Sequence, residues 1–250
     1  ASADQAVARI RLAAQPPCNE EHSRHMAAAK ALSGAPVYVS DGPNECNMEA
    51  IAPLCFTDGR IIRPLAPGTP VYDDVFFQPD TGNAYRVMAP LPNRIATFSG
   101  TNIEGQPGNV TATFKPEMYA QASGLIQPYP GEWKMPKAGL VYFDVYAQKG
   151  GVFDQPIHFE LAEFSDCLLQ VSPVENGWAL IGRTDKYLCG AAVERVVSSK
   201  TRLVLNLPEA GPVAIFAAYG NPKSDDIEFT DLGNHIYQAT LPAGLVSITR

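Results

Sequence analysis

The feature that most constrains this chain is a series of short β-prone runs that fills the sequence from about Arg60 onward. Turn-forming pairs such as Gly150-Gly151 and Asn176-Gly177 separate the runs. Runs of this kind, without helical periodicity between them, indicate antiparallel strands stacked as a sandwich. The clearest runs are 94–100, 109–115, 140–147, 156–164, 177–183, 201–207, 212–219, 235–241 and 245–250.

Several runs alternate with the period of two that a strand imposes on its side chains. Val141 and Phe143 fall on one face of their run, and Tyr142 and Asp144 fall on the other. We therefore predict a mainly β fold, in which residues 59–250 form a C-terminal antiparallel β-sandwich domain.

The first 58 residues follow a helical period instead. Asn19 is a suitable N-cap for an alanine-rich helix, and Gly34 stands where a left-handed C-terminal cap belongs. One strand with its helices leaves faces and edges unpaired, so this α/β segment (1–58) packs on something else or belongs to a larger architecture. Its predicted elements are helices over 4–14 and 20–33, a strand over 36–40 and a short helix over 47–54.

Charge and hydropathy argue against two classes of partner. The chain has 26 acidic and 19 basic residues, a net charge of −7, and no Lys/Arg cluster of the kind that nucleic-acid binding needs. No apolar run approaches the roughly 18–20 residues of a membrane span. We therefore expect no nucleic-acid partner and no membrane partner.

Five cysteines (18, 46, 55, 167 and 189) include no Cys-x-x-Cys pair, and their odd number argues against a disulfide framework. We expect reduced, structural thiols, with a Cys46–Cys55 bridge as the alternative. Reduced thiols slightly favour a cytoplasmic location. A secreted chain whose signal has been removed stays open, because the sequence would read the same.

A metal site is not predicted either. Cys18, His22 and His25 have a C-x3-H-x2-H spacing that could bring three ligands to one helix face. A zinc site needs a fourth ligand or a water, and nothing else in the sequence nominates one. We expect no metal and no cofactor.

Three stretches, in chain order, carry a resemblance to a known family. They are "HMAAAKALSGAPVYVSDGP" (25–43), "LCFTDGRIIRPLAPGTPVYDDVFFQP" (54–79) and "LLQVSPVENGWALIGRTDKYLCGAAV" (168–193). They resemble segments of the raffinose synthase and alkaline α-galactosidase group, the seed imbibition proteins of glycoside hydrolase family 36. In that family the Tyr-Val-Ser-Asp strand is the last of a (β/α)₈ barrel, and a β-sandwich follows it.

The resemblance implies that residues 1–58 are the end of such a barrel. The chain would then be the C-terminal portion or a subunit of a glycoside hydrolase or galactosyltransferase acting on α-galactosides, with a companion chain carrying the rest of the barrel. Ser40 and Asp41 would line a sugar pocket at the end of the barrel strand, where such folds build substrate contacts. The sequence Ser-Asp-Gly-Pro is equally a good turn.

The family's two catalytic carboxylates have no counterpart in this sequence. The resemblance implies a nucleophilic Asp in a Lys-x-Asp strand and an acid/base Asp in an Asp-Trp-Asp-like stretch, as a retaining mechanism requires. Lys223-Ser-Asp225 matches the first motif only in letters, because it falls in a late turn. "QPPCNEEHS" stands in place of the second, and Glu20 and Glu21 suit a helix start. The catalytic residues are therefore unknown, and this chain alone should not cleave glycosides.

Two aromatic residues and one acidic pair are further candidates. Trp133, in "YPGEWKMP", is predicted to be partly exposed and is a candidate sugar-stacking platform. Trp178, in an apolar run, is predicted to pack in the core. Asp73 and Asp74 would point in opposite directions, which fits solvation or calcium better than an acid–base couple.

A different class of function stays open. The chain could be a non-catalytic carbohydrate-binding or structural β-sandwich protein, or a degenerate homologue with a regulatory role. The two main hypotheses differ in what they predict for residues 1–58. A barrel fragment should expose an apolar face there, whereas in a self-contained sandwich protein the helices 4–14 and 20–33 should pack on the sandwich.

Overall fold

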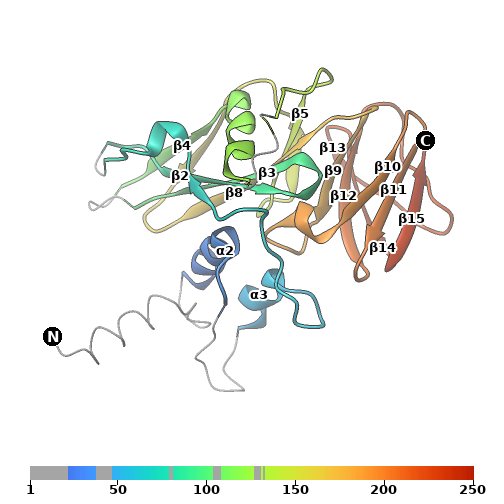
Figure 1. Cartoon of the computed structure of the whole chain (residues 1–250), viewed down its shortest axis with the longest axis horizontal. Helices are drawn as coiled ribbons and strands as arrows, with labels where there is room; N and C mark the ends of the chain where they lie inside the picture. Colours follow the sequence, from blue (N-terminus) through green and yellow to red (C-terminus); the bar gives the residue numbers. More distant parts are fainter. Residues whose placement is uncertain (1–21, 38–46, 79–80, 104–107, 127–130, 132) are drawn as a thin grey trace.

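The computed structural model describes residues 22–37, 47–78, 81–103, 108–126, 131 and 133–250. Within them the fold is mainly antiparallel β, as predicted, and every pairing between named strands is antiparallel (Figure 1). The strands are β1 (Thr69–Pro70), β2 (Tyr85–Leu91), β3 (Ile95–Thr101), β4 (Val110–Phe114), β5 (Leu140–Asp144), β6 (Lys149–Val152), β7 (Ile157–Leu161), β8 (Asp166–Pro173), β9 (Trp178–Arg183), β10 (Glu194–Ser198), β11 (Arg202–Leu207), β12 (Gly211–Ala217), β13 (Thr230–Gly233), β14 (Ile236–Leu241) and β15 (Gly244–Thr249). All nine predicted runs contain strands.

The helical elements are short. None that is described combines the length and the apolar character that crossing a bilayer requires. They are the α-helices α2 (Ser23–Ser33) and α3 (Met48–Ile51) and the 3₁₀ segments η1 (Ala52–Leu54), η2 (Tyr72–Asp74), η3 (Pro92–Arg94), η4 (Pro116–Leu125) and η5 (Cys189–Ala192).

Six strands form the central sheet, in the order β1-β2-β3-β8-β5-β6. β8 lies inside this sheet, and every one of its residues is buried. Leu168 belongs to one hydrophobic core and Leu169 to the other, because successive side chains of a strand point to opposite faces. A strand covered on both faces has no apolar–polar alternation, so the period of two does not reveal it.

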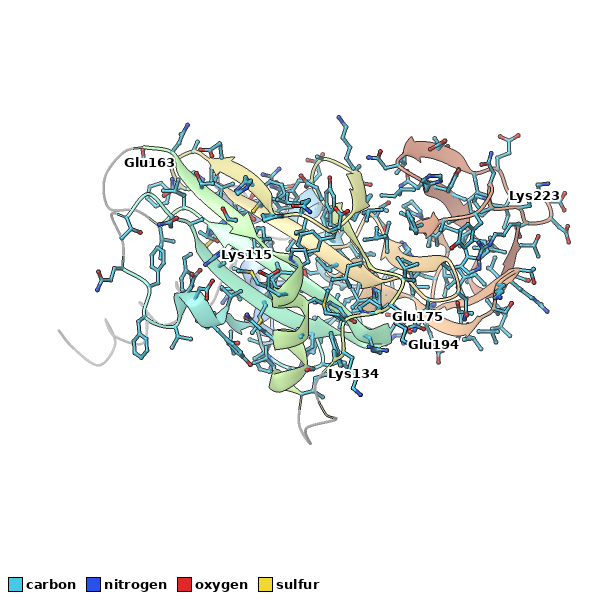
Figure 2. The ribbon with its side chains drawn as sticks, turned by 90° about the horizontal axis from the view of Figure 1, so that it is seen from above. Lys115, Lys134, Glu163, Glu175, Glu194 and Lys223 are labelled. Atoms are coloured by element: carbon cyan, nitrogen blue, oxygen red, sulfur yellow. The ribbon has the colours of Figure 1, made fainter. Side chains whose placement is uncertain are left out.

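The first core lies between one face of the central sheet and a cover made of η4 and the two-stranded sheet β4-β7. Phe98 of β3 and Phe114 of β4 meet with ring centroids 5.8 Å apart, and Tyr119 of η4 is fully buried beside them. Burying each phenylalanine stabilises the fold by roughly 2–3 kcal/mol. Seen from above, η4 lies across the strands (Figure 2).

The second core lies on the opposite face of the central sheet. It is enclosed by α2 and by two further sheets, β13-β14-β12-β9 and β10-β11-β15. Ala27, Ala28 and Ala31 of α2 share this core with Leu168 and Trp178. Figure 1 shows α2 and α3 on the side of the central sheet away from η4. The small alanine side chains allow the helix to approach the sheet closely.

The C-terminal end of α2 is fastened to the sandwich. Gly34 has a φ of +63° and its N–H donates to the Ala31 carbonyl, which confirms the predicted left-handed cap. The Leu32 carbonyl, which has no partner within the helix, accepts a hydrogen bond of 2.8 Å from the N–H of Gly68. A Cβ on Gly68 would lie 3.1 Å from that oxygen, so the close approach favours glycine.

The α/β segment therefore differs from one prediction. The prediction of an exposed apolar face is wrong for α2, because that face is buried against the sandwich. The predicted helix 4–14 and most of the predicted strand 36–40 lie outside the described residues. Helix α2 and the sandwich share one core, and the division at residues 58 and 59 stays a prediction.

Candidate functional site

The predicted substrate-binding residues Ser40 and Asp41 lie outside the described residues. The structure describes the two segments that flank them in the sequence: α2, which ends at Gly34, and α3, which begins after Asn47. Both flanks are attached to the sandwich by polar contacts. We take the junction between these flanks and the sandwich as the candidate site.

The first flank, α2, is attached through its N-terminal turn. The Arg24 guanidinium lies over the Tyr146 ring, 4.1 Å from its centroid. The Tyr146 hydroxyl donates a hydrogen bond of 2.5 Å to the buried carboxylate of Asp166. His25 Nδ1 lies 3.6 Å from the other oxygen of that carboxylate and has no hydrogen-bond partner among the described residues. Burial, reinforced by the negative charge of Asp166, raises the pKa of Tyr146, so this tyrosine stays protonated.

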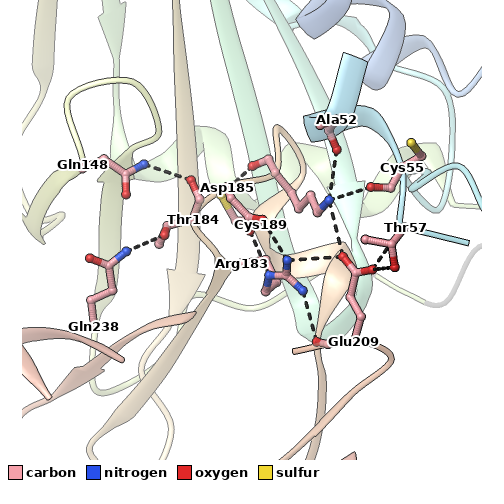
Figure 3. Close-up of polar contacts among 11 residues, drawn as sticks. Ala52, Cys55, Thr57, Gln148, Arg183, Thr184, Asp185, Cys189, Glu209 and Gln238 are labelled. Carbon is pink, nitrogen blue, oxygen red and sulfur yellow. Dashed lines mark hydrogen bonds and ion pairs between the residues drawn. The ribbon is translucent and has the colours of Figure 1, made fainter. Parts of the chain in front are cut away.

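The second flank, α3 with η1, is attached by the residues that follow β9 (Figure 3). Lys186 Nζ donates to the carbonyls of Ala52, at 3.0 Å, and Cys55, at 2.6 Å. The Tyr187 hydroxyl donates to the Ala50 carbonyl at 3.2 Å. The ends of short helices leave carbonyls without partners, and these donors satisfy them.

Glu209 completes this attachment. Its carboxylate accepts two hydrogen bonds of 2.7 Å from the N–H and the hydroxyl of Thr57. Its other oxygen lies 3.2 Å from Arg183 Nη2 and 3.4 Å from Lys186 Nζ. Arg183 also donates to both oxygens of Asp185, at 2.8 and 2.7 Å. Two buried cations thus share a set of carboxylates and carbonyls, an arrangement that avoids the cost of an unpaired buried charge.

These contacts shift the pKa of Glu209. Burial disfavours its charged form, but the hydrogen bonds from Thr57 and the nearby charges of Lys186 and Arg183 outweigh burial and hold the pKa of Glu209 below its usual value. Burial likewise works against the charge of Arg183, yet Asp185 and Glu209 together raise the pKa of Arg183. Both groups are therefore charged at neutral pH. Burial raises the pKa of Tyr187 to about 12.

Two clefts open beside this junction and meet at Arg24. The first has a volume of about 260 Å³ and is lined by Glu49, Tyr146, Asp185 and Lys186 among others. The second, of about 370 Å³, is lined by His22, His25, Glu163, Phe164, Ser165 and Asp166 as well as Arg24. Arg24, which lines both clefts, stacks its guanidinium on the Tyr146 ring, and Glu49 lines the first cleft. Lys186, which lines the first cleft, is occupied by the Ala52 and Cys55 carbonyls and by Glu209.

Sequence reasoning missed Lys186 and Glu209 as junction residues. "GRTDKY" did mark residues 182–187 as part of a family stretch, but nothing in the sequence pairs them with Thr57 or Glu209.

The acidic pair Asp73 and Asp74 also differs from its prediction. Asp74 is buried and accepts hydrogen bonds from Arg86 instead of pointing into solvent, while Asp73 is exposed.

The prediction that Trp133 is partly exposed is wrong. The residue is 7% exposed and packs on Tyr119, with ring centroids 5.3 Å apart, and its backbone N–H donates to Ser123 Oγ. Trp133 packs against η4 (Pro116–Leu125), so the ring does not present a free face to a sugar. Trp178 is 1% exposed, which confirms its core assignment, and the Arg250 guanidinium stacks on it at 4.2 Å.

The remaining candidates are placed as follows. Lys223 and Asp225 are exposed residues of the turn before β13. Lys223 lies near one end of the molecule (Figure 2). Cys55 is a free thiol, and Cys46, its partner in the alternative prediction, lies outside the described residues. Burial raises the pKa of Cys167 and of Cys189 to about 12, which makes both thiols inert. Among the described residues, no three His, Cys, Asp or Glu side chains are grouped to hold a metal ion.

Comparison with known proteins decides the relationship. Residues 13–87 match the family described as raffinose synthase or seed imbibition protein Sip1. The probable galactinol–sucrose galactosyltransferase 6 of Arabidopsis thaliana is 43% identical over 267 aligned residues, which cover 93% of this chain. The predicted resemblance to the raffinose synthase group is confirmed.

The chain spans only part of its relatives in the raffinose synthase group. It covers 34% of galactosyltransferase 6, and a second Arabidopsis thaliana protein, the probable galactinol–sucrose galactosyltransferase 1, is 36% identical over 74 residues, or 28% of this chain and 10% of that protein. Among solved structures, α-galactosidase I from Mortierella vinacea superposes with a TM-score of 0.41 and 14% identity, over 62% of this chain and 36% of that one.

Proposed function

We propose that this chain is the C-terminal portion or a subunit of a glycoside hydrolase or galactosyltransferase that acts on α-galactosides. The observation that carries the proposal is the 43% identity, over nearly the whole chain, to a probable galactinol–sucrose galactosyltransferase three times as long. The catalytic carboxylates would come from protein outside these 250 residues, because the family's two aspartate motifs have no counterpart here.

Within such an enzyme the sandwich acts as a scaffold for the substrate-binding segment. Ser40 and Asp41 stand between two flanks that the sandwich holds, one through Tyr146 and the sheet, the other through Lys186 and Glu209. Fixing both ends of a segment reduces the entropy it loses when it binds a ligand. The Asp41 carboxylate would accept hydrogen bonds from galactosyl hydroxyls, as the family resemblance implies.

The test is galactosyl transfer from galactinol to sucrose by the full-length protein that carries this sequence. Asp41→Ala should lower kcat/KM by about 10- to 100-fold, because a hydrogen bond to a charged group contributes roughly 1.5–3 kcal/mol. Asp154→Ala is the matched control, since Asp154 is exposed in the turn between β6 and β7. Equal activity of both variants would reject the role of Asp41, and a parent protein that neither transfers nor hydrolyses α-galactosyl groups would reject the proposal.

A non-catalytic carbohydrate-binding or structural sandwich is the second candidate. The packing of α2 onto the sandwich favours it, because a self-contained protein needs its helices covered in this way. This candidate predicts that the 250 residues either bind an α-galactoside without converting it or bind no sugar. It replaces the first proposal if the full-length protein binds galactinol but transfers no galactosyl group.

A further inference from the structure

The segment around η2 exposes three large apolar side chains within five residues. Tyr72 is 60%, Val75 57% and Phe76 92% exposed, and Phe76 is the most exposed large apolar residue among those described. We call these three residues the Phe76 patch. Single exposed apolar residues are ordinary on protein surfaces, but a group of them usually marks an interaction site.

The backbone under the patch is held firmly. Buried Asp74 accepts three hydrogen bonds from Arg86: 2.7 Å from its N–H, 2.9 Å from Nε and 2.6 Å from Nη2. Arg86 also donates to the Thr113 carbonyl at 2.6 Å, which ties the pair to β4. Charge-assisted bonds of this kind are the strongest available to a surface segment.

Further contacts hold the segment at both ends. The N–H of Tyr72 donates to Gln121 Oε1 at 3.1 Å, which links the segment to η4. The Phe77 ring packs edge-on against Tyr85, with centroids 5.3 Å apart. Phe76 is thus presented by a fixed backbone while its own ring contacts solvent, so binding through it would cost little ordering entropy.

We propose that the Phe76 patch is the surface on which the remaining part of the longer protein docks. This inference rests on the proposed function. The occupant is argued from length and position: the chain covers 34% of its relative, and the patch lies inside residues 13–87, the part that matches the family. The rest of such a protein needs a contact surface on this chain, and the Phe76 patch offers exposed apolar side chains within the family-matched segment.

The patch also specifies the chemistry of its partner. Phe76 and Val75 require an apolar pocket that is desolvated on docking. Asp73, 57% exposed at its side chain and 3.9 Å from Arg86 Nη2, stands at the edge of the patch with most of its carboxylate free. The pocket should therefore have a basic or N–H donor group on its rim, because opposite charges at a rim fix register more than affinity.

Photo-crosslinking in the full-length protein tests this assignment directly. Phe76 is replaced by benzoylphenylalanine, and Leu245, 72% exposed on β15, is replaced in the matched control. We expect Phe76 cross-links, mapped by mass spectrometry, to residues outside these 250, and none of them from position 245. Cross-links only within the 250 residues or to a second copy, or no excess over the control, overturn the proposal.

A substitution gives a second, independent measurement. Phe76→Ser should leave the thermal unfolding of the 250-residue chain unchanged, because the side chain buries almost nothing in this chain, and should lower the unfolding temperature of the full-length protein, in which the docked ring is buried. Leu245→Ser should change neither. A full-length Phe76→Ser variant that unfolds at the parental temperature contradicts the docking site.

The docking site and the proposed function can fail separately. Cross-links from position 76 to the remainder, without galactosyl transfer, keep the docking site and reject the function. Galactosyl transfer without those cross-links keeps the function and rejects the docking site.

Discussion

Glu209 accepts hydrogen bonds of 2.7 Å from both the N–H and the hydroxyl of Thr57, a residue 152 positions earlier in the chain. This contact joins the end of the helical segment to the loop between β11 and β12. Because Lys186 and Arg183 also face Glu209, one carboxylate links the segment to two buried cations of the sandwich.

Removing the charge of Glu209 should therefore weaken the junction. Glu209→Gln keeps the shape of the side chain but leaves Lys186 and Arg183 facing a neutral amide, and we expect the free energy of unfolding to fall by about 3 kcal/mol. Urea denaturation measures it. Glu228→Gln, at an exposed glutamate, is the control and should stay within roughly 0.5 kcal/mol of the parent. Equal effects of the two changes would mean that the ion pairs contribute nothing.

The contribution of Glu209 should depend on pH in one direction. Its pKa is lower in the folded state than in the unfolded state, so the unfolded chain binds the proton more tightly. The stabilisation is complete above the unfolded glutamate pKa of about 4.3 and is lost as the pH falls through the folded value. The difference in unfolding free energy between the parent and Glu209→Gln should shrink from about pH 7 to about pH 3. A difference that grows on acidification contradicts this assignment.

The ion pair between Asp74 and Arg86 should also stabilise the folded state. Asp74→Asn leaves a buried guanidinium facing a neutral amide, and we expect a loss of about 3 kcal/mol in unfolding free energy. Asp73→Asn is the neighbouring control, since Asp73 is largely exposed and should cost less than about 0.5 kcal/mol. Chemical denaturation of both variants checks this, and comparable losses would show that burial of Asp74 does not matter.

Trp133 should behave as a core residue. Trp133→Ala removes a ring packed on Tyr119 and should cost about 3–5 kcal/mol of unfolding free energy. Phe164→Ala, at a residue 56% exposed, should cost much less. Thermal unfolding compares the two. A Trp133→Ala variant of parental stability with weakened sugar binding would restore the platform interpretation.

Local pattern was sufficient for nine of the strands and for the cap of α2. All nine predicted runs contain strands, and Gly34 has its predicted left-handed conformation. β8 was not among the predicted runs, because its buried residues show no alternation, and β1 was missed because its two residues carry no period. β9 is also buried along its whole length, but its short apolar run follows the turn pair Asn176-Gly177 and was predicted from that boundary.

The site depended on contacts that no local pattern encodes. Trp133 lies among proline, glycine and charged residues, which suggested exposure, but η4 packs over it. The junction pairs Thr57 with Glu209 and Ala52 with Lys186 across more than a hundred residues. The family stretch containing Lys186 was recognisable in sequence, but its partner was not.

The central claim is that these 250 residues work as part of a larger α-galactoside-acting protein. The most direct measurement is size-exclusion chromatography with light scattering on native material carrying this sequence, with galactosyl transfer assayed across the peak, beside the 26.9 kDa chain alone. The account predicts activity in native material of roughly three times that mass and none in the isolated chain. Native material that elutes as an inactive monomer of 26.9 kDa would contradict it.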